Sequence, residues 1–534
     1  MQQLETDILI VGGGLGGVAC AIAAASAGRR VIVVEETKWI GGQLTSQMTP
    51  PDEHGWIEHV GATRSYREMR ERVRDFYRKN YPLTEIANSN RFLNPGNGWV
   101  SPLCAEPKVF LKVITSMIEP FVSEGRIQII HSAVAIGVRR EGRELEEVLV
   151  RQLACGEELS VKAKYFVDAT ETGELLPLAD VEFVSGAESQ AETGETSAKA
   201  VKESSNSQAF SVCFAVSHHL GKDFTVDEPA DFEFWRDFIP TLNPPWSGRL
   251  LSLTGINPRT LEPVTYSFNP NTEPYKAFAG LWSYRRILHT DNFEQDFLDS
   301  DVTVINVPQI DYFLDDLAGA ETREQRASII ERAKGLSLSF LYFLQTECGL
   351  RGLKLRGDIS GTPDGLAMAP YVRESRRIKA EYTITEGDVA ATANPGEKFG
   401  ARYSDSIGVG SYRIDLHPSV GGDNYIDVEA LPFQIPLGAL IPRDVDNLLP
   451  ACKNIGTTHI TNGCYRLHPV EWNIGEVVGY LAAFCLERGV RPRDVRSDRV
   501  RCDEFIKHIS KAGVETEWPE DLDLAGGDPH RHAK

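Results

Sequence analysis

Three glycines and one acid near the N-terminus have the types and spacing needed to hold a dinucleotide by its pyrophosphate. An apolar run leads into Gly12, Gly14 and Gly17, an alanine-rich stretch follows, and a β-branched run ends at Glu35. In this chemistry one glycine permits the turn, one lets backbone amides approach the phosphates, and one lets helix and strand pack closely, while an acid about 20 residues on accepts bonds from the ribose. A strand–helix–strand unit that binds nothing would explain the sheet but not the spaced glycines with the acid.

The residues that follow favour a flavin over a nicotinamide. Gly41, Gly42, Gln43, Leu44 and Thr45 come after the second strand, where flavoproteins run a glycine-bearing loop along the pyrophosphate and ribityl chain. No second glycine fingerprint follows a later strand, which argues against a separate NAD(P)H domain. The loop also lacks the paired cysteines of flavin disulfide reductases. The sequence therefore predicts FAD as the cofactor, without dithiol chemistry and without a metal.

A flavin dehydrogenase also needs an acid or base for the accompanying proton, and cations that orient a polar substrate. Five residues in segments expected to converge are our catalytic candidates: His59, Arg373, His459, Arg466 and His468. The last three are favoured because they lie between the flavin segment and the helix that follows it. Arg373, beside Tyr371, is the predicted substrate-facing cation. Each histidine has the alternative of an ordinary core or surface residue.

These groups need a scaffold that brings strand ends and a helix terminus together. We predict an α/β fold, with a Rossmann-like FAD-binding domain in three ββα layers and a discontinuous α+β substrate or cap domain. Residues 165–170 predict a further buried strand whose small final residues would face the nucleotide. A helix after Pro469 would direct its N-terminus at the flavin pyrimidine ring. Gly475 and Gly479 would let this helix lie close to a flat ligand.

Length and local composition divide the chain into domains. At 534 residues it exceeds the usual size of one core. We predict an FAD-binding domain at 1–180 with a loop insertion at 50–107, a substrate or cap domain at 181–430, a C-terminal return to the FAD-binding domain at 431–490, and an extension and tail at 491–534. Residues 321–346 have helical spacing. The polar residues 186–207 predict a long exposed loop or a lid, with disorder as the alternative.

Charge and cysteine usage limit the partners. The formal charge of −20 argues against nucleic acid or an anionic membrane, since both reward basic patches. Nine scattered cysteines form no CxxC pair and suit a reducing compartment. The N-terminus is acidic where a secretory signal would be basic, and its apolar run is too short for a membrane span. We therefore predict a cytoplasmic protein with a small-molecule substrate, an unknown electron acceptor and an undetermined oligomeric state.

Several stretches together resemble the FAD-dependent oxidoreductase family often labelled putative xanthan lyases, within the glutathione-reductase-like flavoprotein superfamily. They span nearly the whole chain and are GGGLGG, GGQLTSQ, DATETGELLPLA, YVRESRRIKAEYTITEGDV and PFQIPLGALIPRDVDNLLPACKNIGTTHITNGCYRLHPVEWNIGEVVG. Two positions depart from the superfamily pattern. Glu171 stands where a glycine is usual, and Cys452 and Lys453 replace a glycine–aspartate pair near the ribityl group.

The resemblance implies which residues contact FAD. Those for the AMP and pyrophosphate part are Gly12, Gly14, Leu15, Gly16, Gly17, Glu35, Gly42, Gln43 and Thr45, and those flanking the adenine are Ala169, Thr170 and Gly173. Ala451, Lys453 and Asn454 would meet the ribityl chain, with Asn473 and Gly475 beneath the isoalloxazine.

The predicted function is oxidation or reduction of a small polar organic molecule by hydride transfer to or from FAD. A flavin-dependent lyase or isomerase is the alternative, and it differs in leaving the flavin spectrum intact through turnover. A binding or assembly protein with a vestigial flavin is a third hypothesis. The His, Arg and Tyr residues in the predicted loops argue against that third reading.

Overall fold

The computed structural model describes residues 2–274 and 279–526. Its centre is a five-stranded parallel sheet in the order β23-β8-β2-β3-β4. The strands are β2 (Ile8–Val11), β3 (Val31–Glu35), β4 (Ile127–His131), β8 (Tyr165–Asp168) and β23 (Leu448–Pro450). The strands are apolar because both faces of a parallel sheet are covered. The last strand arrives from far along the chain, so the C-terminal part completes the sheet that the N-terminus begins.

Different elements cover the two faces of this sheet, and the side chains along each strand point alternately to one face and to the other. Ile8, Ile10 and Val33 belong to the core beneath α1 (Leu15–Ser26), α4 (Pro107–Ser123) and α13 (His468–Arg488). Leu9 and Val34 belong to a second core. That core is shared with a four-stranded sheet in the order β1-β7-β6-β5, formed by β1 (Gln2–Glu5), β7 (Glu158–Lys162), β6 (Glu144–Gln152) and β5 (Ala133–Glu141). Because side chains alternate with period two, one strand sequence serves both layers. The predicted three-layer ββα arrangement is confirmed.

Glycines set the closeness of α1 and α13. A Cβ at Gly475 would collide with the Gly16 carbonyl, and one at Gly479 would collide with the Cys20 carbonyl. A Cβ at Gly17 would likewise meet the Gly12 carbonyl. The two α13 glycines therefore allow contact between helices. This corrects the expectation that they face a flat ligand.

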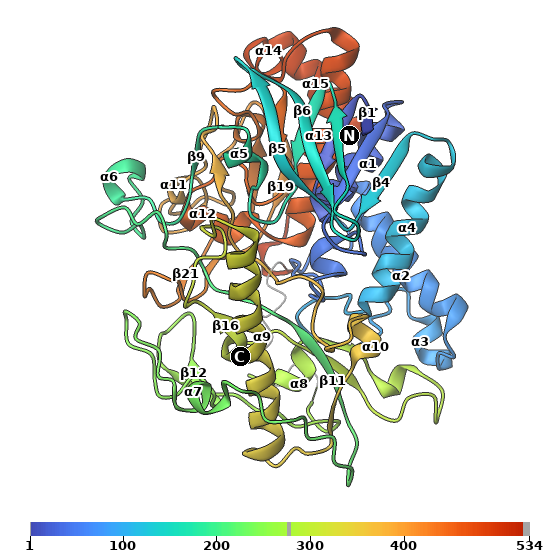
Figure 1. The fold of residues 1–534 in the computed structure, drawn as a ribbon, viewed down its shortest axis with the longest axis vertical. Coiled ribbons are helices and arrows are strands. Elements are labelled where there is room, and N and C mark those ends of the chain that lie inside the picture. The colour runs from blue at the N-terminus through green and yellow to red at the C-terminus, as the bar shows by residue number, and fades with distance from the viewer. Residues whose placement is uncertain (1, 275–278, 527–534) are drawn as a thin grey trace.

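A separate apolar core lies in the part of the chain between residues 209 and 425. Its antiparallel sheet runs β14-β15-β11-β17, formed by β14 (Arg286–Leu288), β15 (Val302–Ile305), β11 (Phe214–His218) and β17 (Leu353–Leu355). The long helix α9 (Arg323–Thr346) packs into the same core, and it begins where the Thr322 hydroxyl accepts a bond from the Gln325 amide. In Figure 1 this green and yellow part lies below the blue and red segments of the parallel sheet. The predicted helix at 321–346 is confirmed to within two residues.

Several further helices cover the parallel-sheet part of the molecule. α2 (Arg64–Asn80) lies in the predicted insertion, and its buried Arg70 pairs with Glu53 at 2.9 Å. α12 (His459–Tyr465), α14 (Pro492–Ser497) and α15 (Arg499–Ala512) follow β23. The end of the predicted tail, residues 527–534, lies outside the described residues. None of the helices described is long and apolar enough to cross a membrane.

Candidate functional site

A cavity of about 530 Å3 lies at the carboxyl ends of the central parallel strands. This is the edge at which open α/β sheets bind ligands, and the volume is within the usual range of about 300 to 1,000 Å3 for such pockets. The strand ends and their turns contribute Val11, Gly12, Gly14, Val34, Glu35, Gly42, Ala169, Thr170 and Glu171. The opposite wall comes from the second core's part of the chain, with Arg326, Ile330, Met368, Ala369, Pro370 and Val372. The cavity therefore lies between the two parts of the molecule.

Glu35 marks one end of this cavity. Its Oε2 accepts a bond from the Gly13 amide at 2.8 Å, and its Oε1 accepts bonds from the Thr37 amide at 2.8 Å and hydroxyl at 2.6 Å. Burial raises the pKa of Glu35 to about 7 despite these bonds. A carboxylate fixed in this way keeps lone pairs for a ribose hydroxyl.

The N-terminus of α1 forms the middle of the cavity. In the described part of the chain, the Gly14 and Leu15 amides donate to no acceptor, while the Gly16 amide reaches Glu471 Oε1 at 3.3 Å. Free amides and the helix dipole at such a terminus favour a phosphate. Gly14 and Gly42 both line the cavity here.

A buried group of four residues lies beside the α1 terminus, and we call it the Lys453 cluster: Glu171, Cys452, Lys453 and Glu471. Lys453 Nζ pairs with Glu171 Oε2 and lies 3.4 Å from Glu471 Oε2 and 3.3 Å from Cys452 Sγ. The three acidic or thiol groups lie close enough together to hold a metal ion. The Lys453 ammonium already contacts all three, so it supplies the positive charge that a metal would bring.

A second polar group lies behind the cavity wall formed by residues 368–372, and we call it the Tyr371 cluster: Asp311, Tyr371, Arg373, Asp415, His417 and Arg466. Arg466 Nη1 donates to the Tyr371 hydroxyl at 3.1 Å, and its Nη2 donates to Asp415 Oδ2 at 3.1 Å. The Arg373 guanidinium lies 5.0 Å from the centre of the Tyr371 ring. The cluster therefore gathers residues from four separate segments near the Tyr371 ring and hydroxyl.

Ion pairs balance the charges of the Tyr371 cluster. Arg373 pairs with Asp311 at 2.9 Å, and His417 Nδ1 lies 2.6 Å from the other oxygen of Asp311. Burial raises the pKa of Asp415, but His417 and Arg466 outweigh burial and hold that pKa below its ordinary value. Burial raises the pKa of Tyr371. The cluster thus holds ionised aspartates beside a neutral tyrosine hydroxyl.

The model of the FAD dependent oxidoreductase family matches residues 7–503. The chain belongs to this family. Hydroxyneurosporene desaturase from Rhodobacter capsulatus is 50% identical over 49 residues, so the match spans 9% of this chain and 10% of that protein.

Solved structures that are similar to the chain have low identity. A geranylgeranyl bacteriochlorophyll reductase-like protein from Thermoplasma acidophilum is 11% identical, over 96% of this chain and 85% of that one, with a TM-score of 0.28. L-proline dehydrogenase from P. horikoshii is 16% identical, over 35% of this chain and 24% of that one, with a TM-score of 0.18.

The predicted enzyme class and cofactor are confirmed: the protein is an FAD-dependent oxidoreductase. The cavity residues fit FAD, because the free amides of Gly14 and Leu15 suit a diphosphate and the fixed Glu35 carboxylate suits the ribose. Six of the predicted cofactor residues line the cavity, namely Gly12, Gly14, Glu35, Gly42, Ala169 and Thr170. Lys453 does not line it but pairs with Glu171, which does.

Other predicted cofactor residues serve the scaffold around the cavity. Thr45 donates to the Ile40 carbonyl at 2.7 Å, Asn454 to the Asp168 carbonyl at 2.9 Å, and Asn473 to the Ile407 carbonyl at 3.2 Å. A Cβ at Gly173 would press on residues 375–376, and one at Gly16 would collide with the Ala451 carbonyl. The rest of this group is Leu15, buried in the core, Gly17 and Gly475 at helix contacts, and Gln43, whose amide donates to Glu471 at 2.6 Å. The side chains of Thr45, Asn454 and Asn473 meet protein groups, so their predicted contact with the cofactor remains a proposal, whereas Gly475 faces α1.

The structure separates the five catalytic candidates. Arg373 and Arg466 meet in the Tyr371 cluster. His468 begins α13, and its Nδ1 accepts the Asp52 amide at 3.0 Å, which leaves the proton on Nε2. Burial lowers the pKa of His468 to about 4, and its Nε2 has no hydrogen-bond partner among the described residues. His468 is therefore a neutral, buried donor.

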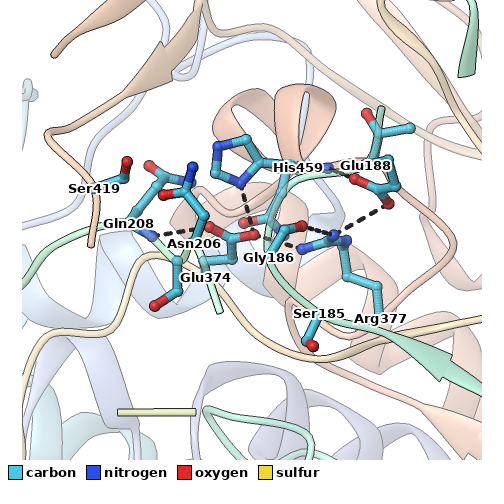
Figure 2. A network of polar contacts seen from close by, with 12 residues as sticks. Ser185, Gly186, Glu188, Asn206, Gln208, Glu374, Arg377, Ser419 and His459 are labelled. Carbon is cyan, nitrogen blue, oxygen red and sulfur yellow. Dashed lines mark hydrogen bonds and ion pairs between the residues drawn. The ribbon is translucent and has the colours of Figure 1, made fainter. Parts of the chain in front are cut away.

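His459 belongs to a different group, the His459 network of Glu188, Glu374, Arg377 and His459 shown in Figure 2. Its Nδ1 lies 2.9 Å from Glu374 Oε1, which also accepts a bond from Arg377 at 2.5 Å. Glu188 accepts from the His459 amide at 2.9 Å and pairs with Arg377 at 3.1 Å. These four residues are linked by ion pairs and hydrogen bonds, and none of them lines the cavity. The structure therefore places His459 in an ion network away from the cavity, and its catalytic role remains a prediction.

The His459 network also involves the loop at 186–207 that was predicted as a lid. Glu188 lies in the 186–207 loop, and Glu195 of that loop accepts a bond from the Thr458 hydroxyl at 2.6 Å. Lys199 pairs with Asp423 at 2.9 Å. Hydrogen bonds to Glu188 and Glu195 fasten the loop to the start of α12, and Lys199 fastens it to Asp423, so neither disorder nor an open lid describes it in this structure. His59 is exposed and its ring contacts Phe92 in a T-shaped arrangement, away from the cavity, and its catalytic role also remains a prediction.

Several cavity residues escaped the sequence prediction. Ser46 and Gln47 directly continue the predicted flavin loop, so that loop was the available signal. Arg326 and residues 368–372 had no such signal, because only the packing of the second core brings them to the cavity.

Proposed function

We propose that the protein transfers a hydride between FAD and a small polar organic molecule held at the Tyr371 cluster. The observation that carries this proposal is the placement of Tyr371. Pro370 and Val372 line the cofactor cavity, while Tyr371 between them bonds to Arg466 on the side of the cluster. A proton-transferring group therefore lies next to the place where FAD would supply redox chemistry.

The cluster's residues suit an acceptor-rich substrate. Arg373 Nε, Arg466 Nε and His468 Nε2 are buried donors without a partner among the described residues. Each such donor costs roughly 1–3 kcal/mol unless it is satisfied. A hydroxyl, carbonyl or carboxylate oxygen of the substrate would satisfy these donors and orient the molecule. Tyr371 would exchange the proton with the reacting oxygen or nitrogen, and Asp415 would keep Arg466 in position.

The proposed substrate site takes its residues from two of the predicted domains. The substrate or cap domain at 181–430 contributes Tyr371, Arg373 and Asp415, and the C-terminal return at 431–490 contributes Arg466 and His468. We also propose that the chain belongs to the glutathione-reductase-like superfamily, with the group labelled putative xanthan lyases, because it carries the GGGLGG and GGQLTSQ motifs and the longer C-terminal stretches of that group.

Anaerobic mixing of the holoenzyme with sugars, polyols, amines and hydroxy acids tests the proposal. We expect one class to bleach the oxidised flavin absorption band. The Tyr371→Phe variant should retain FAD but be reduced more slowly by about 100-fold or more, the usual contribution of a general acid or base. Product formation with an unchanged flavin spectrum would instead establish the lyase or isomerase alternative.

A further inference from the structure

The carboxylate of Glu171 lies over the two glycines that should face the diphosphate. A Cβ added to Gly14 would be 3.1 Å from Glu171 Oε1, and one added to Gly42 would be 3.2 Å from the same oxygen. Glu171 also lines the cavity with both glycines. Glycine at these positions lets phosphates approach the backbone. A negative side chain therefore occupies the approach that a negative ligand group needs.

The rest of the Lys453 cluster is held more firmly than Glu171. Glu471 accepts bonds from the Gly16 amide at 3.3 Å and from Gln43 at 2.6 Å, and both Glu471 and Lys453 have side chains only 1% exposed. The Glu171 side chain is 18% exposed and has Lys453 as its ion-pair partner. Glu171 is thus the member that can turn away while Lys453 stays in place.

We propose that Glu171 is an internal competitor for the FAD diphosphate, which must displace the Glu171 carboxylate and take over Lys453 when the cofactor binds. Two carboxylates already share one ammonium in the cluster. A diphosphate added beside them without displacement would face like charges, which costs several kcal/mol. This inference concerns cofactor affinity alone, so it stands apart from the proposed substrate and reaction.

FAD release from the holoenzyme tests the proposal. The dissociation constant is measured from the recovery of flavin fluorescence on serial dilution, for the wild type, Glu171→Gln, Glu171→Gly and the matched control Glu174→Gln. Glu174 lines the same cavity but is not part of the Lys453 cluster. We expect both Glu171 variants to bind FAD about tenfold or more tightly, equivalent to about 1.4 kcal/mol, and the control to bind like the wild type. Equal or weaker binding by a folded Glu171 variant overturns the proposal.

The pH dependence of the FAD dissociation constant provides a second test. Burial raises the pKa of Glu171 against the opposing effect of Lys453, while Glu471, Cys452 and Gln47 are its other close neighbours. Protonation should remove the competition, so the ratio of the wild-type to the Glu171→Gln dissociation constant should fall toward one as the pH is lowered. Glu35, with a pKa of about 7, titrates in both proteins and cancels in this ratio. A ratio that stays at one throughout overturns the proposal.

Discussion

The nucleotide end of the site is formed mainly by backbone groups, whereas the Tyr371 cluster is formed by side chains. At the nucleotide end, Gly12, Gly14 and Gly42 present backbone to the cavity, and one acid, Glu35, completes the arrangement. At the Tyr371 cluster, paired side chains from separate segments surround one hydroxyl. A site made of backbone depends on local turns, whereas a site made of side chains depends on how distant segments pack.

This difference has consequences for binding and turnover. The backbone end should control whether FAD is retained, with little dependence on the Tyr371 cluster. The side-chain end should control turnover while leaving FAD in place. Changes at each end therefore test whether the two roles are separable.

The largest effect is expected from Gly14→Leu. The new side chain would project into the cavity where the phosphates approach, and overpacking of about 3 kcal/mol corresponds to FAD binding weakened about 100-fold. Purified protein should be nearly colourless, with a far-UV circular dichroism spectrum like that of the wild type. A folded variant that keeps its full flavin content would contradict the placement of the diphosphate.

A smaller effect, confined to turnover, is expected from Arg466→Lys. Lysine keeps the charge but cannot bond to Tyr371 and Asp415 at once, and losing one charged hydrogen bond costs about 1.5–3 kcal/mol. The rate of flavin reduction should fall about 10- to 100-fold with flavin content unchanged. Arg413→Lys is the matched control, because Arg413 pairs with Asp427 outside the cluster. Loss of FAD from Arg466→Lys alone would show that the two ends are not separable.

The smallest effect is expected from pH acting on the His459 network. Burial lowers the pKa of His459, but Glu374 outweighs burial and raises the pKa above its ordinary value, while Arg377 opposes and Glu188 assists. A raised pKa in the folded state stabilises the protein below the unfolded value of about 6.5, and this stabilisation is lost as pH rises through the folded pKa. The wild-type Tm should therefore fall further above neutral pH than that of His459→Gln, by on the order of 2 °C. Parallel Tm profiles for the two proteins would remove His459 from the pH response.

The nucleotide end could be predicted because its information is local. Gly12 adopts a positive φ in the turn, and Gly17 accommodates the close Gly12 carbonyl, so both requirements act within a few residues. The helical spacing of residues 321–346 was readable for the same reason. Gly475 shows the limit of such predictions from local sequence. A glycine in a helix signals a close neighbour but does not say whether that neighbour is a ligand or another helix.

The roles of the catalytic candidates were harder to predict, because the type of a residue, histidine or arginine, does not show whether it belongs to a buried ion network or to an active site. His459 and Arg466 are seven positions apart, yet one pairs with Glu374 and the other with Tyr371. Nothing in their local sequence distinguishes those partners.

By itself, then, the sequence determined a parallel sheet with an FAD site at the α1 terminus, since turns, caps and strand periodicity are set by neighbouring residues. The tertiary structure decided that Glu171 lies over Gly14 and that Tyr371 lies beside the cavity with Arg466. Those placements arise from contacts between segments far apart along the chain, where burial and charge pairing, rather than spacing along the chain, select each partner.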